Sequence, residues 1–142
     1  MALGFSPESD VSWLLLYTKP HAEAWADINL RHQGFMTLVP RVRFRAGVRP
    51  LFPRYLFAGV PPDRLPRPLA NTFGVLYVVR CGAQPARVPL DVIHELRSRM
   101  NEQGLVEIHG AEPPDPLFAK RERERVNALV KLAHAGFRVR SA

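Results

Sequence analysis

Apolar and aromatic residues fill almost every position from Ser12 to Thr18, without glycine or proline. A continuous run of this length is typical of a buried strand. Pro20 follows shortly, and apolar residues then recur at helical spacing as far as Gln33, just before Gly34. Proline is favoured in the first turn of a helix and glycine just after its end, so the pattern predicts a helix from about Pro20 to Gln33.

Arginine alternates with apolar residues in the next segment, Arg41–Arg45. Period-two alternation predicts a half-buried strand with its arginines on one face and Val42 and Phe44 on the other. Residues 46–50 have the composition of a turn, and the apolar segment 51–60 is interpreted as the returning strand. The sequence therefore predicts a hairpin that carries a basic face.

The second half of the chain repeats this mixture of strand and helix patterns. Residues 75–79 are β-branched and aromatic and predict a strand. A helix with Asp91 as its N-cap is expected before Gly104. Residues 113–116 read Pro-Pro-Asp-Pro, which indicates a boundary, and residues 120–135 have the spacing of a basic amphipathic helix. The order of elements predicts an α/β (α+β) sandwich, in which helices pack on one sheet.

Length and composition limit the class of protein. The 142 residues fit one domain with an appendage, and 46% apolar residues can form a core. One cysteine, Cys81, excludes an intramolecular disulfide and a cysteine-rich zinc site, which favours a reducing, cytoplasmic environment. We expect no signal peptide and no membrane segment, because the longest apolar runs are strand-sized.

The net charge of +7 is concentrated in two segments. Residues 41–54 hold five arginines and no acid, and residues 120–142 hold seven basic residues and two acids. Clustered arginine suits a surface that binds phosphate groups, because neutralising each phosphate releases a counterion. A solvated surface that keeps the protein in solution explains the charge equally well.

No pattern of catalytic residues is evident. The sequence has no glycine-rich phosphate loop, no HExxH or GxSxG motif and no spaced pair of acids. The five histidines are scattered, and Cys81 beside Arg80 is more readily a packing residue than an activated thiol. The sequence therefore predicts neither an enzyme nor a bound cofactor.

A stronger signal for function is the segment Pro50–Phe57, which crowds large apolar side chains around two prolines. In an alternating strand Tyr55 and Phe57 share one face. If they join Ile93 and Leu96 on one exposed surface, the four form an anchor of the kind found at protein interfaces. Spacing alone favours the simpler interpretation that all four lie in the core.

Four motifs in register resemble the N-terminal domain of NusG-type transcription factors, over roughly residues 12–105. The likeness is greatest to the specialised RfaH-type antiterminators. The resemblance implies an NGN-like domain over residues 11–112, with a central, mostly antiparallel sheet flanked by helices. The motifs are Ser12-Trp13 with Leu15-Leu16-Tyr17 and Lys19; Pro50-Leu51-Phe52-Pro53 with Tyr55-Leu56-Phe57; Gly74-Val75 with Val79-Arg80 and Gly82; and Pro85-Ala86, Val88-Pro89, Val92-Ile93-His94 and Leu96.

The same resemblance implies a monomer that binds the clamp helices of RNA polymerase and promotes processive elongation. Its polymerase contacts map onto Tyr55, Phe57, Ile93 and Leu96, and onto Cys81, which replaces an aromatic residue. Its contact to non-template DNA maps onto Lys19. We further predict nucleic-acid contacts from His21 and Phe73, and from the arginines at 41, 43, 45 and 49, which suit upstream DNA or an acidic surface of the polymerase. Phe73 stands where the RfaH type has arginine, and Asn29 where it has a DNA-facing histidine, so recruitment to a specific DNA sequence is not implied.

The C-terminal region departs most from the family, which continues into a β-barrel KOW domain. We expect no complete KOW domain here, and interpret residues 113–142 as a basic helical tail or a degenerate remnant of that region. Coupling to the ribosome or to a termination factor is therefore not expected. One alternative function is a stand-alone nucleic-acid-binding module that uses Arg41–Arg54 and the tail. A regulatory hypothesis is that Val126, Leu129 and Val130 cover the surface around Tyr55 and Phe57.

Overall fold

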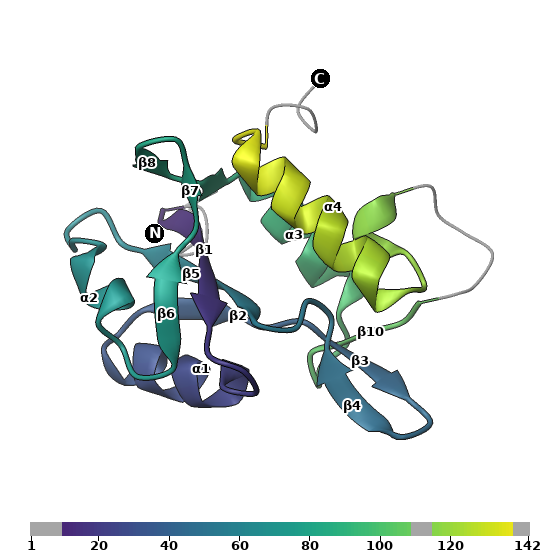
Figure 1. Ribbon diagram of the computed structural model, residues 1–142. Helices are drawn as coiled ribbons and strands as arrows, with labels where there is room; N and C mark the ends of the chain where they lie inside the picture. Colours follow the sequence, from purple (N-terminus) through teal and green to yellow (C-terminus); the bar gives the residue numbers. More distant parts are fainter. Residues whose placement is uncertain (1–9, 109–114, 138–142) are drawn as a thin grey trace, which may run out of the picture.

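A five-stranded antiparallel sheet forms the centre of the molecule (Figure 1). The computed structural model describes residues 10–108 and 115–137. Four strands run in the order β2-β5-β1-β6, and β9 also pairs with β1. The bounds are Ser12–Thr18 for β1, Met36–Leu38 for β2, Tyr55–Val60 for β5, Val75–Val78 for β6 and Arg87–Val88 for β9.

Two smaller sheets flank the central one. The first has the order β10-β3-β4, in which β10 pairs with β3 in parallel and β3 with β4 in antiparallel fashion. The second is a short hairpin of β7 and β8. The bounds are Arg41–Phe44 for β3, Gly47–Pro50 for β4, Arg80–Cys81 for β7, Gln84–Pro85 for β8 and Leu105–Val106 for β10.

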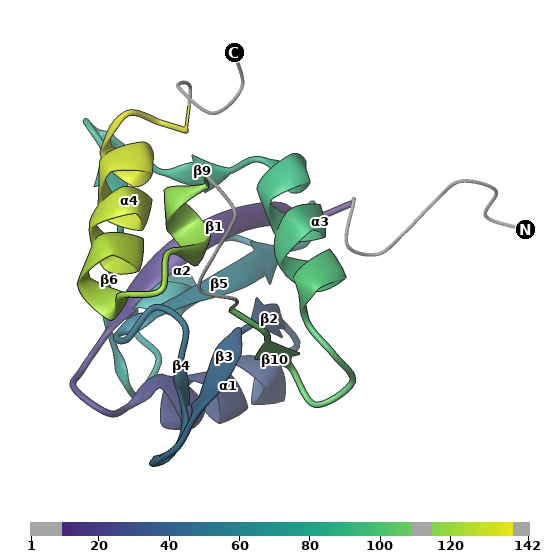
Figure 2. The same cartoon turned by 90° about the vertical axis from the view of Figure 1, so that its right-hand side faces the viewer.

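Helices cover both faces of the central sheet and make the sandwich that the sequence predicts (Figure 2). One face packs against α1 and α2, and the other against α3 and α4. The bounds are Glu23–His32 for α1, Arg67–Ala70 for α2, Leu90–Arg99 for α3 and Glu122–His134 for α4, with a 3₁₀ turn, η1, at Pro116–Phe118. None of these described helices is long and apolar enough to cross a membrane.

The continuous apolar run of β1 follows from its position between two helical layers. Leu14 and Leu16 pack in the cluster that contains Leu30 of α1. Leu15, on the opposite face, packs in the cluster that contains Ile93 of α3 and Leu129 of α4. A strand that is buried on both faces takes apolar side chains, as residues 13–16 of β1 do.

The segment after β2 differs from the hairpin that the sequence predicts. The partner of β3 is β4, at residues 47–50, whereas residues 55–60 form β5 of the central sheet. The register pairs Val42 with Arg49, so Arg49 lies on the same face as Val42 and opposite to Arg41 and Arg43. The hairpin is therefore basic on both faces. Phe44, predicted to lie with Val42 on the buried face of the strand, is 40% exposed.

Two helices begin differently from their predicted starts. Helix α1 starts at Glu23 instead of Pro20, because His21 has a φ of 60°, which no right-handed helix allows. The N-cap of α3 is Pro89, in extended conformation, and Asp91 lies in the first helical turn. The predicted capping role of Asp91 is therefore wrong, although its negative charge still interacts favourably with the helix dipole.

Gly74 fixes the turn before β6 against α1. Its φ is +93°, and an added Cβ would lie 3.1 Å from the backbone nitrogen of Ala26. We expect Gly74→Ala to lower the free energy of unfolding by about 3 kcal/mol, because backbone strain and a clash with a helix backbone add together. Gly82→Ala is the matched control: its φ is +66° but an added Cβ meets nothing within 4 Å, so the cost should be only about 1 kcal/mol. Urea denaturation of both variants measures the difference, and equal losses would contradict the proposed clash.

Candidate functional site

The predicted polymerase-contacting residues meet on one face of the central sheet. Phe57 comes from β5, and Ile93 and Leu96 come from the buried side of α3, where they are three residues apart. All three belong to one apolar cluster, and Tyr55 and Cys81 pack at its margin. We call these five residues the polymerase patch; they are Tyr55, Phe57, Cys81, Ile93 and Leu96.

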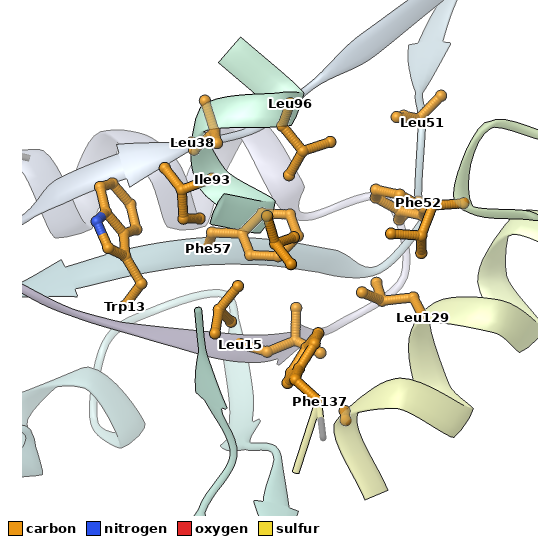
Figure 3. Close-up of a cluster of buried hydrophobic side chains, with 14 of the residues drawn as sticks. Trp13, Leu15, Leu38, Leu51, Phe52, Phe57, Ile93, Leu96, Leu129 and Phe137 are labelled. Carbon is orange, nitrogen blue, oxygen red and sulfur yellow. The ribbon is translucent and has the colours of Figure 1, made fainter. Parts of the chain in front are cut away.

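Helix α4 and Phe137, which follows it, pack into the same apolar cluster as Phe57, Ile93 and Leu96 (Figure 3). Leu129, Ala133 and Phe137 are fully buried in the same cluster as Phe57. Phe57 and Ile93 are 0% exposed and Leu96 is 1% exposed, in a cluster to which the sheet, α3, η1 and α4 all contribute. The spacing of these residues alone already favoured a place in the core. Residues of the basic C-terminal segment, in α4, belong to the same core. Of the three tail residues expected to cover the patch, Leu129 is buried, and Val126 and Val130 are half-buried.

Tyr55 remains half-exposed at the end of a row of three tyrosines. The Tyr17 ring centre is 5.0 Å from that of Tyr55 and 5.0 Å from that of Tyr77, across strands β5, β1 and β6. The guanidinium carbon of Arg54 lies 4.3 Å from the Tyr17 ring centre, a cation–π distance. Burial raises the pKa of Tyr55, and the neighbouring Tyr77 and Tyr17 raise it further, so its hydroxyl stays a neutral hydrogen-bond donor.

Sequence reasoning missed Tyr17 and Tyr77 as members of this row. Tyr17 pairs directly with Tyr55 in the β1–β5 register, so the strand pattern held the signal once those strands were neighbours. Beside the row, a groove of about 450 Å³ lies between the sheet and α4. Its lining includes Tyr55, Tyr77, Arg80, Val130 and His134. The groove marks the edge of the surface that α4 covers.

The residues predicted to bind nucleic acid fall into two groups. Lys19 is exposed just after β1, and its backbone N–H donates to the carbonyl oxygen of Gly74 at 2.9 Å, which places it beside Phe73. Phe73 is 75% exposed and therefore is not a core residue. His21 is exposed in the same turn as Lys19. Trp25, 55% exposed on α1, is a further surface aromatic that sequence reasoning passed over as part of an apolar stripe.

The second group lies on the β3–β4 hairpin, which projects from the body of the molecule (Figure 1). Arg43, Arg45 and Arg49 are exposed, and Arg41 is half-buried. We call these four residues the basic hairpin. Because its arginines point to both sides of a two-stranded ribbon, the positive charge surrounds the hairpin instead of lining one face.

Residues 11–97 match the model of the family described as transcription termination factor nusG. The match covers more than half of the chain and includes the central sheet, α1, the basic hairpin and the part of α3 that carries Ile93 and Leu96. The chain belongs to the NusG family.

Membership of the NusG family makes this protein a transcription factor with RNA polymerase as its general partner. All five residues of the polymerase patch lie within the matched range, and so do Lys19, His21, Phe73 and the basic hairpin. Helix α4 lies outside it. The proposed cover of the patch therefore lies beyond the matched NusG-family domain.

Proposed function

We propose that this NusG-family protein is an elongation and antitermination factor that binds the clamp helices of RNA polymerase through the polymerase patch. The observation that carries the proposal is the convergence of the patch. Its residues come from β5, β7 and α3, which are distant in sequence, and they meet on one face of the sheet. Large apolar side chains gathered in this way form the centre of a typical protein interface. The factor acts by binding, without catalysis or a cofactor, as a monomer on the transcribing polymerase in the cytoplasm.

In this proposal α4 moves aside when polymerase binds to the patch. Phe57, Ile93 and Leu96 have at most 1% of their surface exposed while α4 is docked. Polymerase gains affinity only from side chains that it can reach. We therefore take the docked arrangement as the form of the factor that is not bound to polymerase. Polymerase then competes with α4 for the same apolar side chains, and the apparent affinity depends on the fraction of molecules in which α4 is undocked.

The direct test is binding of core RNA polymerase by the full chain and by Tyr55→Ala. We expect Tyr55→Ala to weaken binding by about tenfold or more, because a half-exposed tyrosine at the rim of an apolar interface is a typical anchor. The matched control is Tyr77→Ala. Tyr77 belongs to the same row of tyrosines but is more exposed, lies on the edge strand β6 and is outside the patch. Fluorescence anisotropy of labelled protein titrated with polymerase measures both. An equal loss in the two variants, or none in either, would contradict the proposed interface.

Phe57→Ala is a poor probe of binding, although Phe57 belongs to the patch. The side chain is 0% exposed and touches Phe52 edge-on, with ring centres 6.3 Å apart. Truncating a buried phenylalanine costs about 3–5 kcal/mol of stability. A loss of binding in that variant would not distinguish a missing contact from an unfolded domain, whereas Tyr55→Ala leaves the core intact.

DNA contact is the second part of the proposal. Lys19 and Phe73 are both exposed and lie on neighbouring segments, because the Lys19 N–H bonds to Gly74, the residue after Phe73. An exposed aromatic ring can stack on an unpaired base while the ammonium group meets a phosphate. The basic hairpin, at a separate place, suits duplex DNA or an acidic surface of the polymerase. The exposed, projecting hairpin is also the observation that favours the alternative function, a stand-alone nucleic-acid-binding module.

A further inference from the structure

One charged side chain is completely buried where α4 meets the domain. Arg125, in the first half of α4, is 0% exposed. Its Nε donates to the carbonyl oxygen of Leu51 at 3.0 Å, and its Nη1 donates to those of Ala119 and Lys120, each at 2.9 Å. Leu51 lies between β4 and β5, whereas Ala119 and Lys120 lead into α4. A single guanidinium therefore joins the domain, the entry to α4 and α4 itself.

Burying the Arg125 guanidinium in this way costs free energy. The acceptors described for the guanidinium are neutral carbonyls, and Nη2 is buried with no partner among the described residues. Removing a cation from water costs several kcal/mol, and neutral acceptors return only part of that cost. Burial accordingly lowers the pKa of Arg125, while the nearby Glu122 acts in the opposite direction. A methionine at this position would fill similar space without that penalty.

What the guanidinium supplies is a unique docking geometry. The other buried residues of α4, Leu129 and Ala133, make apolar contacts, which tolerate small shifts of the helix. The hydrogen bond to Leu51 forms only at one position and rotation of α4. Leu51 is itself fixed, because its N–H donates to the carbonyl oxygen of Pro40 at 2.8 Å. A buried polar group that selects one packing register is the best-attested use of such groups.

We propose that Arg125 is the latch that holds α4 over the polymerase patch, and that α4 undocks when the guanidinium loses its three carbonyl acceptors. The role of α4 as a cover rests on the proposed function, but the latch itself is a property of the free protein. Arg125 acts by positioning a helix and has no contact with a partner while α4 is docked.

Cys81 provides a reporter that needs no polymerase. It is the single cysteine of the sequence, and its Sγ lies 3.3 Å from the carbonyl oxygen of His134 at the end of α4. Cys81 is half-buried in the docked arrangement, and we expect its thiol to become more accessible when α4 leaves. When docking and undocking are fast, the rate of reaction with a thiol reagent follows the undocked population.

The test is the rate of Cys81 labelling by 5,5′-dithiobis(2-nitrobenzoate) in the full chain and in Arg125→Met. We expect about tenfold faster labelling in the variant, which corresponds to about 1.4 kcal/mol of lost docking free energy. Arg123→Met is the matched control, since Arg123 is exposed on the same helix and its loss changes the net charge equally. Leu129→Asp, which places a charge in the apolar contact, gives the rate of the undocked state.

Unchanged or slower labelling in Arg125→Met would overturn the latch, because the arginine would then only fill space at a cost in desolvation. Circular dichroism during urea denaturation shows whether the variant keeps its fold. If Arg125→Met does not fold, Arg125→Lys replaces it: the charge stays, but one ammonium group cannot reach all three carbonyls, so labelling should again be faster than in Arg123→Met. Polymerase binding is measured separately. Faster labelling without tighter polymerase binding would support the latch and contradict the proposed function.

Discussion

Removing residues 114–142 should raise the affinity for core RNA polymerase by about ten- to a hundredfold. If the patch is available in roughly 1–10% of molecules, the apparent affinity is only that fraction of the affinity of the open form. Deleting the cover restores the full affinity. The proposed cover is α4 with Phe137, because Leu129, Ala133 and Phe137 are buried in the same apolar cluster as Phe57. Titration of labelled polymerase with the full chain and the shortened chain measures the change.

The deletion needs a control, because it also exposes apolar surface that attracts proteins without specificity. Adding Tyr55→Ala to the shortened chain should return most of the gained affinity, since a specific interface depends on its anchor. Leu129→Asp in the full-length chain should reproduce the gain without shortening the chain, provided that far-ultraviolet circular dichroism shows an intact fold. Equal affinity of the full and shortened chains would mean that α4 does not compete with polymerase. The polymerase patch would then have to be sought elsewhere, for example in the exposed part of the tyrosine row.

Periodicity along the chain was sufficient to predict the elements whose apolar pattern is unambiguous. Strand β1 has its predicted bounds, and α3 and α4 lie where the helical spacing of Ile93 and Leu96, or of Leu129 and Ala133, predicts them. The hairpin was assigned wrongly because residues 47–50 and 51–60 both suit a strand after β3. Short strands with similar patterns compete for one partner, and tertiary packing decides between them.

The sequence predicted which residues come together but not how exposed they are. The motifs around Tyr55 and Ile93 named residues that the structure places in or beside one apolar cluster, whereas their contact with polymerase stays a prediction. The burial of Arg125 was hidden, because it lies in a run of alternating arginine and glutamate that is typical of a solvated helix face. The available signal was its spacing, four residues before Leu129 and eight before Ala133, which puts it on the buried stripe of α4.

Replacing Arg43, Arg45 and Arg49 together with glutamine should weaken binding to duplex DNA and make it much less dependent on salt. All three side chains are exposed on the hairpin that projects from the domain. Each arginine that neutralises a phosphate contributes about 0.9 to the slope of log K against log salt concentration. If all three contact phosphates, the slope should therefore fall by about 2.7 and the affinity at low salt by orders of magnitude. Fluorescence anisotropy of a labelled duplex between about 50 and 200 mM salt measures both quantities.

The control variant replaces Arg67, Arg87 and Arg97 with glutamine. These three arginines are exposed at other places on the domain, so the variant removes the same net charge. A flat, equal loss in the two triple variants would mean that DNA responds only to total charge, which is the solvated-surface interpretation of the basic segments. A loss confined to the hairpin variant assigns the DNA contact to the hairpin. Polymerase binding then separates the two functional hypotheses. A hairpin variant that loses DNA binding but keeps polymerase binding fits an elongation factor with a DNA contact. If the full-length chain binds DNA, and neither it nor the chain without residues 114–142 binds polymerase, the protein fits the stand-alone nucleic-acid-binding module.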